Sequence, residues 1–152
     1  ERPELKTHFI SPWIPQYTIR NKDHQQKVVV CPCHGWIHFR ILGGKLSMVM
    51  FQRSCDILIG CPSNWVQYSA LLLAVADVLG LEPHEFVHMI SDAHIYENQI
   101  PMIEEFLARP THAFPTLKIV NRHDNLFDYR PDDFELTDYE PEPAMKGIPV
   151  AI

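Results

Sequence analysis

Apolar residues in the first half of the chain form two dense runs around a pair of glycines. Residues 27–41 are rich in β-branched and aromatic side chains, and Gly43-Gly44 leads into a second apolar run over residues 45–52. Paired glycines between two such runs predict a tight β-hairpin. Because the second run is apolar on both alternating faces, we expect a sheet covered by a helix on one side and by a second sheet or subunit on the other.

A long helix is predicted over residues 64–79. Pro62 and Ser63 stand just before it and Gly80 follows it, which are typical start and stop signals. Its apolar positions go most of the way round the helix axis, so we expect it to be central and buried. These patterns favour an α+β fold in which a mixed β-sheet carries one central buried helix.

Shorter elements are predicted in the rest of the chain. Residues 85–96 are expected to form one strand with a polar alternating face, and residues 99–108 a second helix with Pro101 in its first turn. Short strands are expected over residues 7–11, 117–120 and 134–136, and residues 12–26 as a long loop. The second helix is expected to turn four apolar side chains inward: Ile100, Ile103, Phe106 and Leu107.

Composition and charge narrow the class of protein. A chain of 152 residues is most simply one domain, here residues 1–152. It has no run of about 18 apolar residues, so no membrane-spanning helix is expected. The net charge of −6 argues against a non-specific nucleic-acid binder, but one pocket for a phosphorylated ligand needs only a few local cations. Four cysteines without a secretory signal indicate reduced thiols in a cytoplasmic protein.

Cys33 is the candidate nucleophile. A reactive thiolate needs a nearby cation or helix N-terminus, and Arg53, which follows the second hairpin arm, supplies a cation if the strand register places it opposite. The alternative is a buried structural cysteine, which is the interpretation given to Cys55 and Cys61. A zinc site is a further alternative, but the spacing of its ligands does not match the usual pairs: Cys31, Cys33, His34, Cys55 and Cys61. No metal is therefore expected.

Arg53 and Ser54 together suit a phosphate, because a guanidinium fork and a hydroxyl both donate to its oxygens. A surface ion pair is the alternative for Arg53. Asp56, three residues later, could be the structural partner of Arg53 or could bind a polar heterocycle.

Asn64 has a donor and an acceptor on one planar group, so it can bind an edge that offers the complementary pair. Its alternative role is a helix N-terminal cap. His94 and Tyr96 lie on one face of the predicted strand and could bind a ribose hydroxyl, or could be satisfied polar residues of the core.

In combination these motifs resemble the thymidylate synthase family, from about Thr7 to the last residue. The resemblance is carried by an ordered set of short runs with closely matching spacing. They are Pro32-Cys33-His34, Gly44-Lys45-Leu46-Ser47, Gln52-Arg53-Ser54-Cys55-Asp56, Gly60, Asn64, Asp92-Ala93-His94-Ile95-Tyr96, Phe127-Asp128-Tyr129-Arg130, Asp133-Phe134-Glu135 and Pro149-Val150-Ala151-Ile152.

The resemblance implies a thymidylate synthase-like fold with one sheet face packed in a homodimer. It also implies methylation of dUMP to dTMP with 5,10-methylenetetrahydrofolate as the carbon and hydride donor. Cys33 would add to C6 of uracil, Arg53 and Ser54 would bind the phosphate, and Asn64 would bind the pyrimidine edge. His94 and Tyr96 would hold the deoxyribose hydroxyl. Asp56 would lie at the dUMP site and bind the pterin ring, and Ala151 and Ile152 would close over the folate.

Two departures accompany the resemblance. Family members are longer at the N-terminus, so this chain is expected to be the catalytic part of a longer one. An arginine pair that crosses the dimer interface in the family falls here on Lys6-Thr7. Two alternative functions are a pyrimidine nucleotide hydroxymethylase on the same fold and a non-catalytic nucleotide- or RNA-binding homologue.

Overall fold

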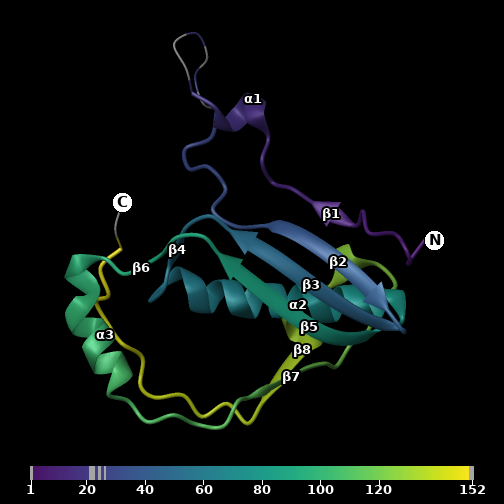
Figure 1. Ribbon diagram of the computed structural model, residues 1–152. Coiled ribbons are helices and arrows are strands. Elements are labelled where there is room, and N and C mark those ends of the chain that lie inside the picture. Colours follow the sequence, from purple (N-terminus) through teal and green to yellow (C-terminus); the bar gives the residue numbers. More distant parts are fainter. Residues whose placement is uncertain (1, 21–22, 24, 26, 151–152) are drawn as a thin grey trace.

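The fold is built on a four-stranded mixed sheet with one long helix across a face (Figure 1). A computed structural model describes residues 2–20, 23, 25 and 27–150. The sheet has the order β1-β2-β3-β5, and β3 pairs antiparallel with β2 but parallel with β5. The strands are β1 (Phe9–Ile10), β2 (Trp36–Leu42), β3 (Lys45–Gln52) and β5 (Glu82–Ile90), and the helix is α2 (Gly60–Leu79). The predicted α+β class and central helix are confirmed.

The glycine pair closes the predicted hairpin between β2 and β3. Gly43 and Gly44 both have positive φ, at 57° and 78°, which is the backbone that a two-residue turn between twisted strands requires. The first arm is shorter than predicted, because it begins at Trp36 and not near residue 27. Pro32 and Gly35 lie in the loop before it, so the chain around Cys33 is a loop and not a strand.

The core lies between the sheet and α2. Leu46, Met48 and Met50 on β3 are fully buried and pack with a stripe of α2. That stripe consists of Tyr68, Leu72 and Ala76. The helix begins at Gly60, earlier than predicted, and ends as expected at Gly80, whose φ of 63° gives a left-handed cap.

The opposite face of the sheet is apolar and exposed within the described chain. By the strand register, Phe9, Phe51 and Met89 share this face with Trp36 and Val49. Phe51 is 39% and Met89 54% exposed. The prediction that a second sheet or subunit covers this face stays a prediction.

Two short strands continue the sheet beyond the ends of β3 and β5. They are β4 (Cys55–Asp56) and β6 (Ala93–His94), which pair in parallel. The single strand predicted over residues 85–96 is therefore wrong, because the chain leaves β3 at Ser91 and changes partner to β4.

The remaining helices are short. They are α1 (Pro15–Thr18), which interrupts the predicted loop, the 3-10 turn Glu97–Gln99, and α3 (Ile100–Leu107). The predicted inward face of α3 is wrong for three of its four residues. Ile100, Phe106 and Leu107 are exposed and only Ile103 is partly buried, because in the described chain α3 lies beside extended segments and not on the sheet (Figure 1).

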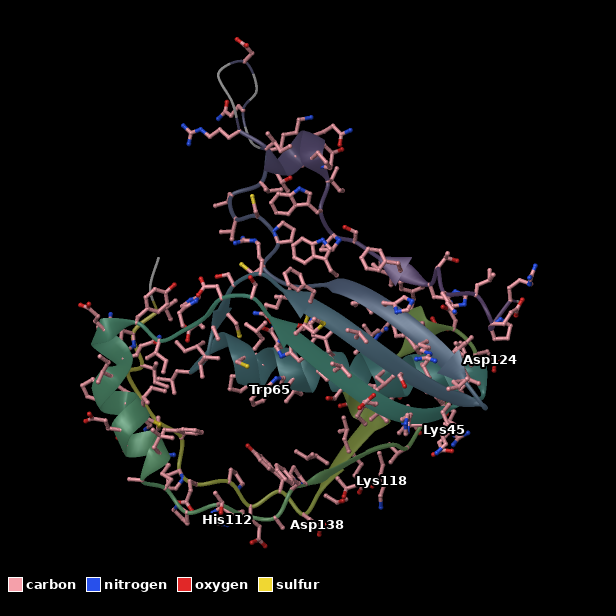
Figure 2. The ribbon with its side chains drawn as sticks, in the orientation of Figure 1. Lys45, Trp65, His112, Lys118, Asp124 and Asp138 are labelled. Carbon is pink, nitrogen blue, oxygen red and sulfur yellow. The ribbon has the colours of Figure 1, made fainter. Side chains whose placement is uncertain are left out.

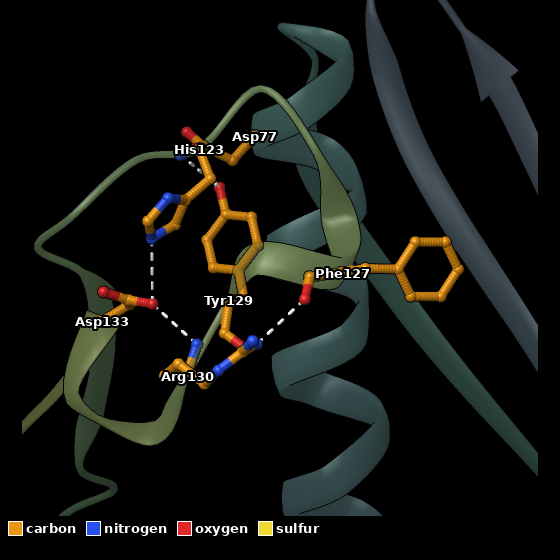
Figure 3. A network of polar contacts seen from close by, with 6 residues as sticks. All are labelled: Asp77, His123, Phe127, Tyr129, Arg130 and Asp133. Carbon is orange, nitrogen blue, oxygen red and sulfur yellow. Dashed lines mark hydrogen bonds and ion pairs between the residues drawn. The ribbon is translucent and has the colours of Figure 1, made fainter.

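A polar network holds the C-terminal strands against the far end of α2 (Figure 3). The antiparallel strands β7 (Thr116–Ile119) and β8 (Phe134–Thr137) are close to prediction and flank the 3-10 turns Leu126–Asp128 and Pro131–Asp133. The Tyr129 hydroxyl donates to Asp77 on α2, and Arg122 Nε lies 3.3 Å from the same carboxylate. Burial raises the pKa of the Tyr129 hydroxyl, and the hydrogen bond to Asp77 raises it further, so the hydroxyl stays protonated and can donate.

Candidate active site

The predicted site residues gather where β3 and β5 end. Because these two strands are parallel, their carboxyl ends lie at the same edge of the sheet. Arg53 and Ser54 follow β3 directly, and Asp92 follows β5. The pairing of β4 with β6 then sets Asp56 opposite His94. Lys45 and the hairpin turn lie at the other end of the sheet (Figure 2).

Arg53 is the anchor of the loop that carries Cys33. Its Nε donates to Pro32 O at 2.8 Å, and its Nη2 donates to Cys31 O at 3.0 Å and to Cys33 Sγ at 3.5 Å. Its backbone N–H donates to Cys33 O at 2.8 Å. The guanidinium therefore both shapes the loop and lies against the half-buried sulfur. The predicted juxtaposition of Cys33 and Arg53 is confirmed.

The other end of this loop is fixed on α2. His34 Nδ1 forms a hydrogen bond with the Tyr68 hydroxyl, and burial lowers the pKa of His34. Gly35 has a φ of 104°, and a Cβ there would lie 3.3 Å from Pro12 and from Tyr68. Only glycine fits this bend without strain. The loop is thus held from the sheet by Arg53 and from the helix by His34.

Cys55 and Cys61 are structural. Each is 1% exposed. Burial is the main cause that raises the pKa of the Cys55 thiol, and the neighbouring Cys61 raises it further, so Cys55 stays protonated and unreactive.

Among the residues that the structure describes, no group of three or more His, Cys, Asp or Glu side chains is placed to hold a metal ion. No helix in that part of the chain is long and apolar enough to cross a membrane.

Asp56 is not the ion-pair partner of Arg53. Its Oδ1 accepts from the backbone N–H groups of Leu58 and Ile59, at 3.0 and 3.2 Å. Its Oδ2 accepts from Gln99 Nε2 at 3.1 Å. A carboxylate oxygen can accept two hydrogen bonds, so Oδ2 retains capacity for a ligand donor.

His94 and Tyr96 lie together, as predicted. Their rings are 5.1 Å apart and meet edge to face. His94 Nδ1 is buried and makes no hydrogen bond in the described part of the chain, although Asp92 Oδ2 is 3.6 Å away. A buried polar atom without a hydrogen bond is rare in a native structure, and a bound ligand or a water molecule would supply the partner.

Asn64 is not a helix cap. It is the fifth residue of α2 and is 8% exposed, and its side chain makes no hydrogen bond within the described residues. No hydrogen bond joins it to Cys33 within the described residues. Ser54 is half-buried, and its carbonyl accepts from Gln52 Nε2 at 2.8 Å. Ala151 and Ile152, predicted at the folate, lie outside the described residues.

Sequence reasoning missed a chain of hydrogen bonds that supports Ser54. Trp65, which extends from the first turns of α2 (Figure 2), donates from Nε1 to His88 Nδ1 at 2.9 Å. Because an indole N–H can only donate, the His88 proton is on Nε2, 2.9 Å from Gln52 Oε1. Burial, and secondarily the charge of His34, lowers the pKa of His88 and so favours this neutral form. The polar face predicted for residues 85–96 was the only signal.

Gln99 was missed because it was predicted merely as the first residue of a helix. Its side chain is completely buried and connects Asp56, Tyr96 and Pro149. A glutamine two residues before a proline in the first turn of a helix gives no sequence signal for such a role.

The site thus contains the Cys33 thiol in contact with the Arg53 guanidinium. Two polar atoms of the paired strands β4 and β6, Asp56 Oδ2 and His94 Nδ1, have capacity to bind a ligand. A comparison with protein-family models matches residues 1–152 to the family described as Thymidylate synthase.

Proposed function

The chain belongs to the thymidylate synthase family, and on that premise we propose that it methylates dUMP to dTMP. The carbon and hydride donor is 5,10-methylenetetrahydrofolate, a co-substrate that supplies a one-carbon unit and leaves as dihydrofolate. The observation that carries the proposal is the contact of Arg53 Nη2 with Cys33 Sγ at 3.5 Å. A cysteine that acts as a nucleophile needs a cationic neighbour, and the Arg53 guanidinium lies in that position.

In this proposal Cys33 opens the reaction. Its sulfur adds to C6 of the uracil ring, and the electron pair of the C5–C6 bond moves so that C5 becomes the nucleophilic carbon. That carbon attacks the methylene group of the folate and loses its proton, and the electron pair left at C5 expels the folate nitrogen to give an exocyclic methylene on the pyrimidine. A hydride from the tetrahydrofolate, which is thereby oxidised to dihydrofolate, then adds to this methylene. The electron pair moves back to re-form the C5–C6 double bond, which breaks the bond between sulfur and C6 and frees Cys33. Arg53 holds the sulfur and the loop while it donates to the phosphate with Nη1, which makes no hydrogen bond in the described residues.

The other predicted residues bind and select. Ser54 donates its hydroxyl to the phosphate, and His94 and Tyr96 hold the deoxyribose hydroxyl, for which the unpartnered His94 Nδ1 is support. Asn64 binds the pyrimidine edge, because a buried amide left unpaired by cytosine would disfavour the wrong base. Asp56 lies at the dUMP site and binds the pterin ring through Oδ2, and Ala151 and Ile152 cover the folate.

We further propose a cytoplasmic homodimer in which residues 1–152 act as one domain. The exposed apolar sheet face around Phe51 and Met89 supports a second subunit there, because patches of this kind mark protein interfaces. The four unpaired thiols support a reducing compartment. Replacement of Phe51 by glutamate should lower the mass measured by light scattering from two chains to one.

The experiment combines dUMP tritiated at C5 with the folate and measures three quantities. Tritium release together with equimolar dihydrofolate and dTMP by mass supports the proposal. Tritium release with a hydroxymethylated product and no dihydrofolate would identify a hydroxymethylase. Binding of dUMP without any tritium release would overturn the enzyme proposal in favour of a nucleotide- or RNA-binding homologue. Whether the product is methylated or hydroxymethylated, Asn64 favours a uracil nucleotide over a cytosine nucleotide as the substrate.

A further inference from the structure

Gln99 is a buried amide whose side chain connects three separate segments of the chain. It is 0% exposed and is the last residue of the 3-10 turn Glu97–Gln99, directly before α3. Its Nε2 donates to Asp56 Oδ2 and to Pro149 O, both at 3.1 Å. Its Oε1 accepts from the backbone N–H of Tyr96 at 3.2 Å. The three partners belong to β4, to the segment before the 3-10 turn and to the C-terminal segment.

These contacts fix the orientation of the amide. Both N–H groups of Nε2 are taken up by acceptors, and Oε1 faces a donor, so a flipped amide would set N–H against N–H and oxygen against oxygen. Asp56 Oδ1 is already held by two backbone N–H groups. The side chain of Gln99 is therefore the group that orients Oδ2, and it does so while holding Pro149.

We propose that Gln99 is a positioning residue that couples the seating of the C-terminal segment at Pro149 to the alignment of the Asp56 carboxylate. This inference rests on the proposed function, in which Asp56 and the last residues bind the folate. Gln99 touches neither substrate. When both hydrogen bonds from Gln99 Nε2 are made, the chain around Pro149 is held in place and Asp56 Oδ2 points to its ligand. When these hydrogen bonds are lost, Pro149 and the Asp56 carboxylate are released together.

Two substitutions separate this role from simple packing. Gln99→Met keeps an unbranched side chain of similar volume but has no donor. Gln99→Glu keeps the shape and sets a carboxylate against Asp56 Oδ2 and the carbonyl of Pro149. Asp56 and Glu97, which is two residues away in the sequence, favour the protonated form of the introduced carboxyl group, and His94, which pairs with Asp56 across β4 and β6, opposes it when it is itself protonated. Protonation restores one donor, so acidification should rescue the glutamate variant but not the methionine variant.

The test uses the full chain and two readouts besides the rate. The first is release of Ile152 by carboxypeptidase, which reports whether the C-terminal segment is seated. The second is KM for the folate measured separately from the affinity for dUMP. Asn98→Asp is the matched control, because it adds the same charge at an exposed neighbouring position.

We expect both variants to raise carboxypeptidase release and folate KM by roughly tenfold near neutral pH, because two buried acceptors lose their donors. Affinity for dUMP should change less than KM for the folate, because Asp56 lies at the dUMP site but its Oδ2, which Gln99 orients, binds the pterin ring in the proposed function. At about pH 5 Gln99→Glu should return toward wild type in carboxypeptidase release. The control should match wild type throughout.

Wild-type release rates in Gln99→Met, or an equal rise in the dUMP and folate constants, would overturn the proposal. Gln99→Glu is compared with itself at two pH values. If this variant simply fails to fold, acidification will not restore the wild-type rate of carboxypeptidase release, and that result also counts against the proposal. If the wild-type protein forms no dTMP but the carboxypeptidase results hold, the proposed function fails and the coupling of Pro149 to Asp56 stands.

Discussion

Replacement of Arg53 by lysine should cost activity although the positive charge remains. The arginine side chain makes three contacts with the loop, at Pro32 O, Cys31 O and Cys33 Sγ. Two of these need the separate Nε and Nη2 groups of a planar fork. A lysine ammonium is a single point and cannot occupy both positions. Arg53→Lys therefore separates the geometry of the guanidinium from its charge.

The magnitude follows from these contacts. At least one hydrogen bond between a charged donor and a half-buried carbonyl is lost, at about 1.5–3 kcal/mol. If this destabilises the reactive position of Cys33 by the same amount, kcat/KM should fall roughly 10- to 150-fold. In Arg53→Gln, which also removes the charge, kcat/KM should fall further, because the phosphate and the sulfur both lose a cationic donor.

The assay is steady-state formation of dTMP, accompanied by the rate at which iodoacetamide alkylates Cys33. Arg122→Lys is the matched control, since the Arg122 side chain is 81% exposed and lies beside Asp77 near the end of α2. Both measured quantities should fall in Arg53→Lys and stay unchanged in the control. An Arg53→Lys variant within about twofold of wild type would refute the reasoning, because that is less than the loss of one charged hydrogen bond.

Two further predictions concern stability. Tyr129→Phe removes the hydrogen-bond donor to Asp77 and should lower the free energy of unfolding, measured in urea, by about 1.5–3 kcal/mol. The control Tyr139→Phe, at an exposed position, should change this free energy little. Equal losses in the two variants would contradict the prediction. Because burial and His34 lower the pKa of His88 below its ordinary 6.5, the unfolded chain binds more protons below that pH. Stability should therefore fall as the pH drops from about 6.5, and His88→Gln should weaken this dependence; an unchanged pH profile in that variant would contradict the assignment.

Local patterns predicted much of the fold because local physics determines it. Gly43-Gly44 needs no tertiary information to form a turn, and Gly80 ends α2 for the same reason. The face of α3 was mispredicted because its surroundings are not encoded locally. Its helical spacing is right, but Phe106 and Leu107 share a surface pocket with Tyr139 and remain exposed.

The site divides in the same way. Cys33 and Arg53 were predicted together because a hairpin register relates the loop before β2 to the residue after β3. The links of Gln99 to Pro149 and of Trp65 to His88 span 50 and 23 residues of sequence. Only the folded chain brings these polar groups together, and neither glutamine nor tryptophan carries a motif that announces such a contact.

The most direct test of the account is covalent trapping of Cys33 by 5-fluoro-dUMP in the presence of the folate. Fluorine at C5 cannot leave as a proton does, so the adduct persists and can be weighed as intact protein and mapped by peptide mass. We predict one adduct per chain on Cys33, none in Cys33→Ser, and a normal adduct in Cys31→Ser. An adduct that survives in Cys33→Ser, or its absence from a wild-type protein that binds the nucleotide, would contradict the account.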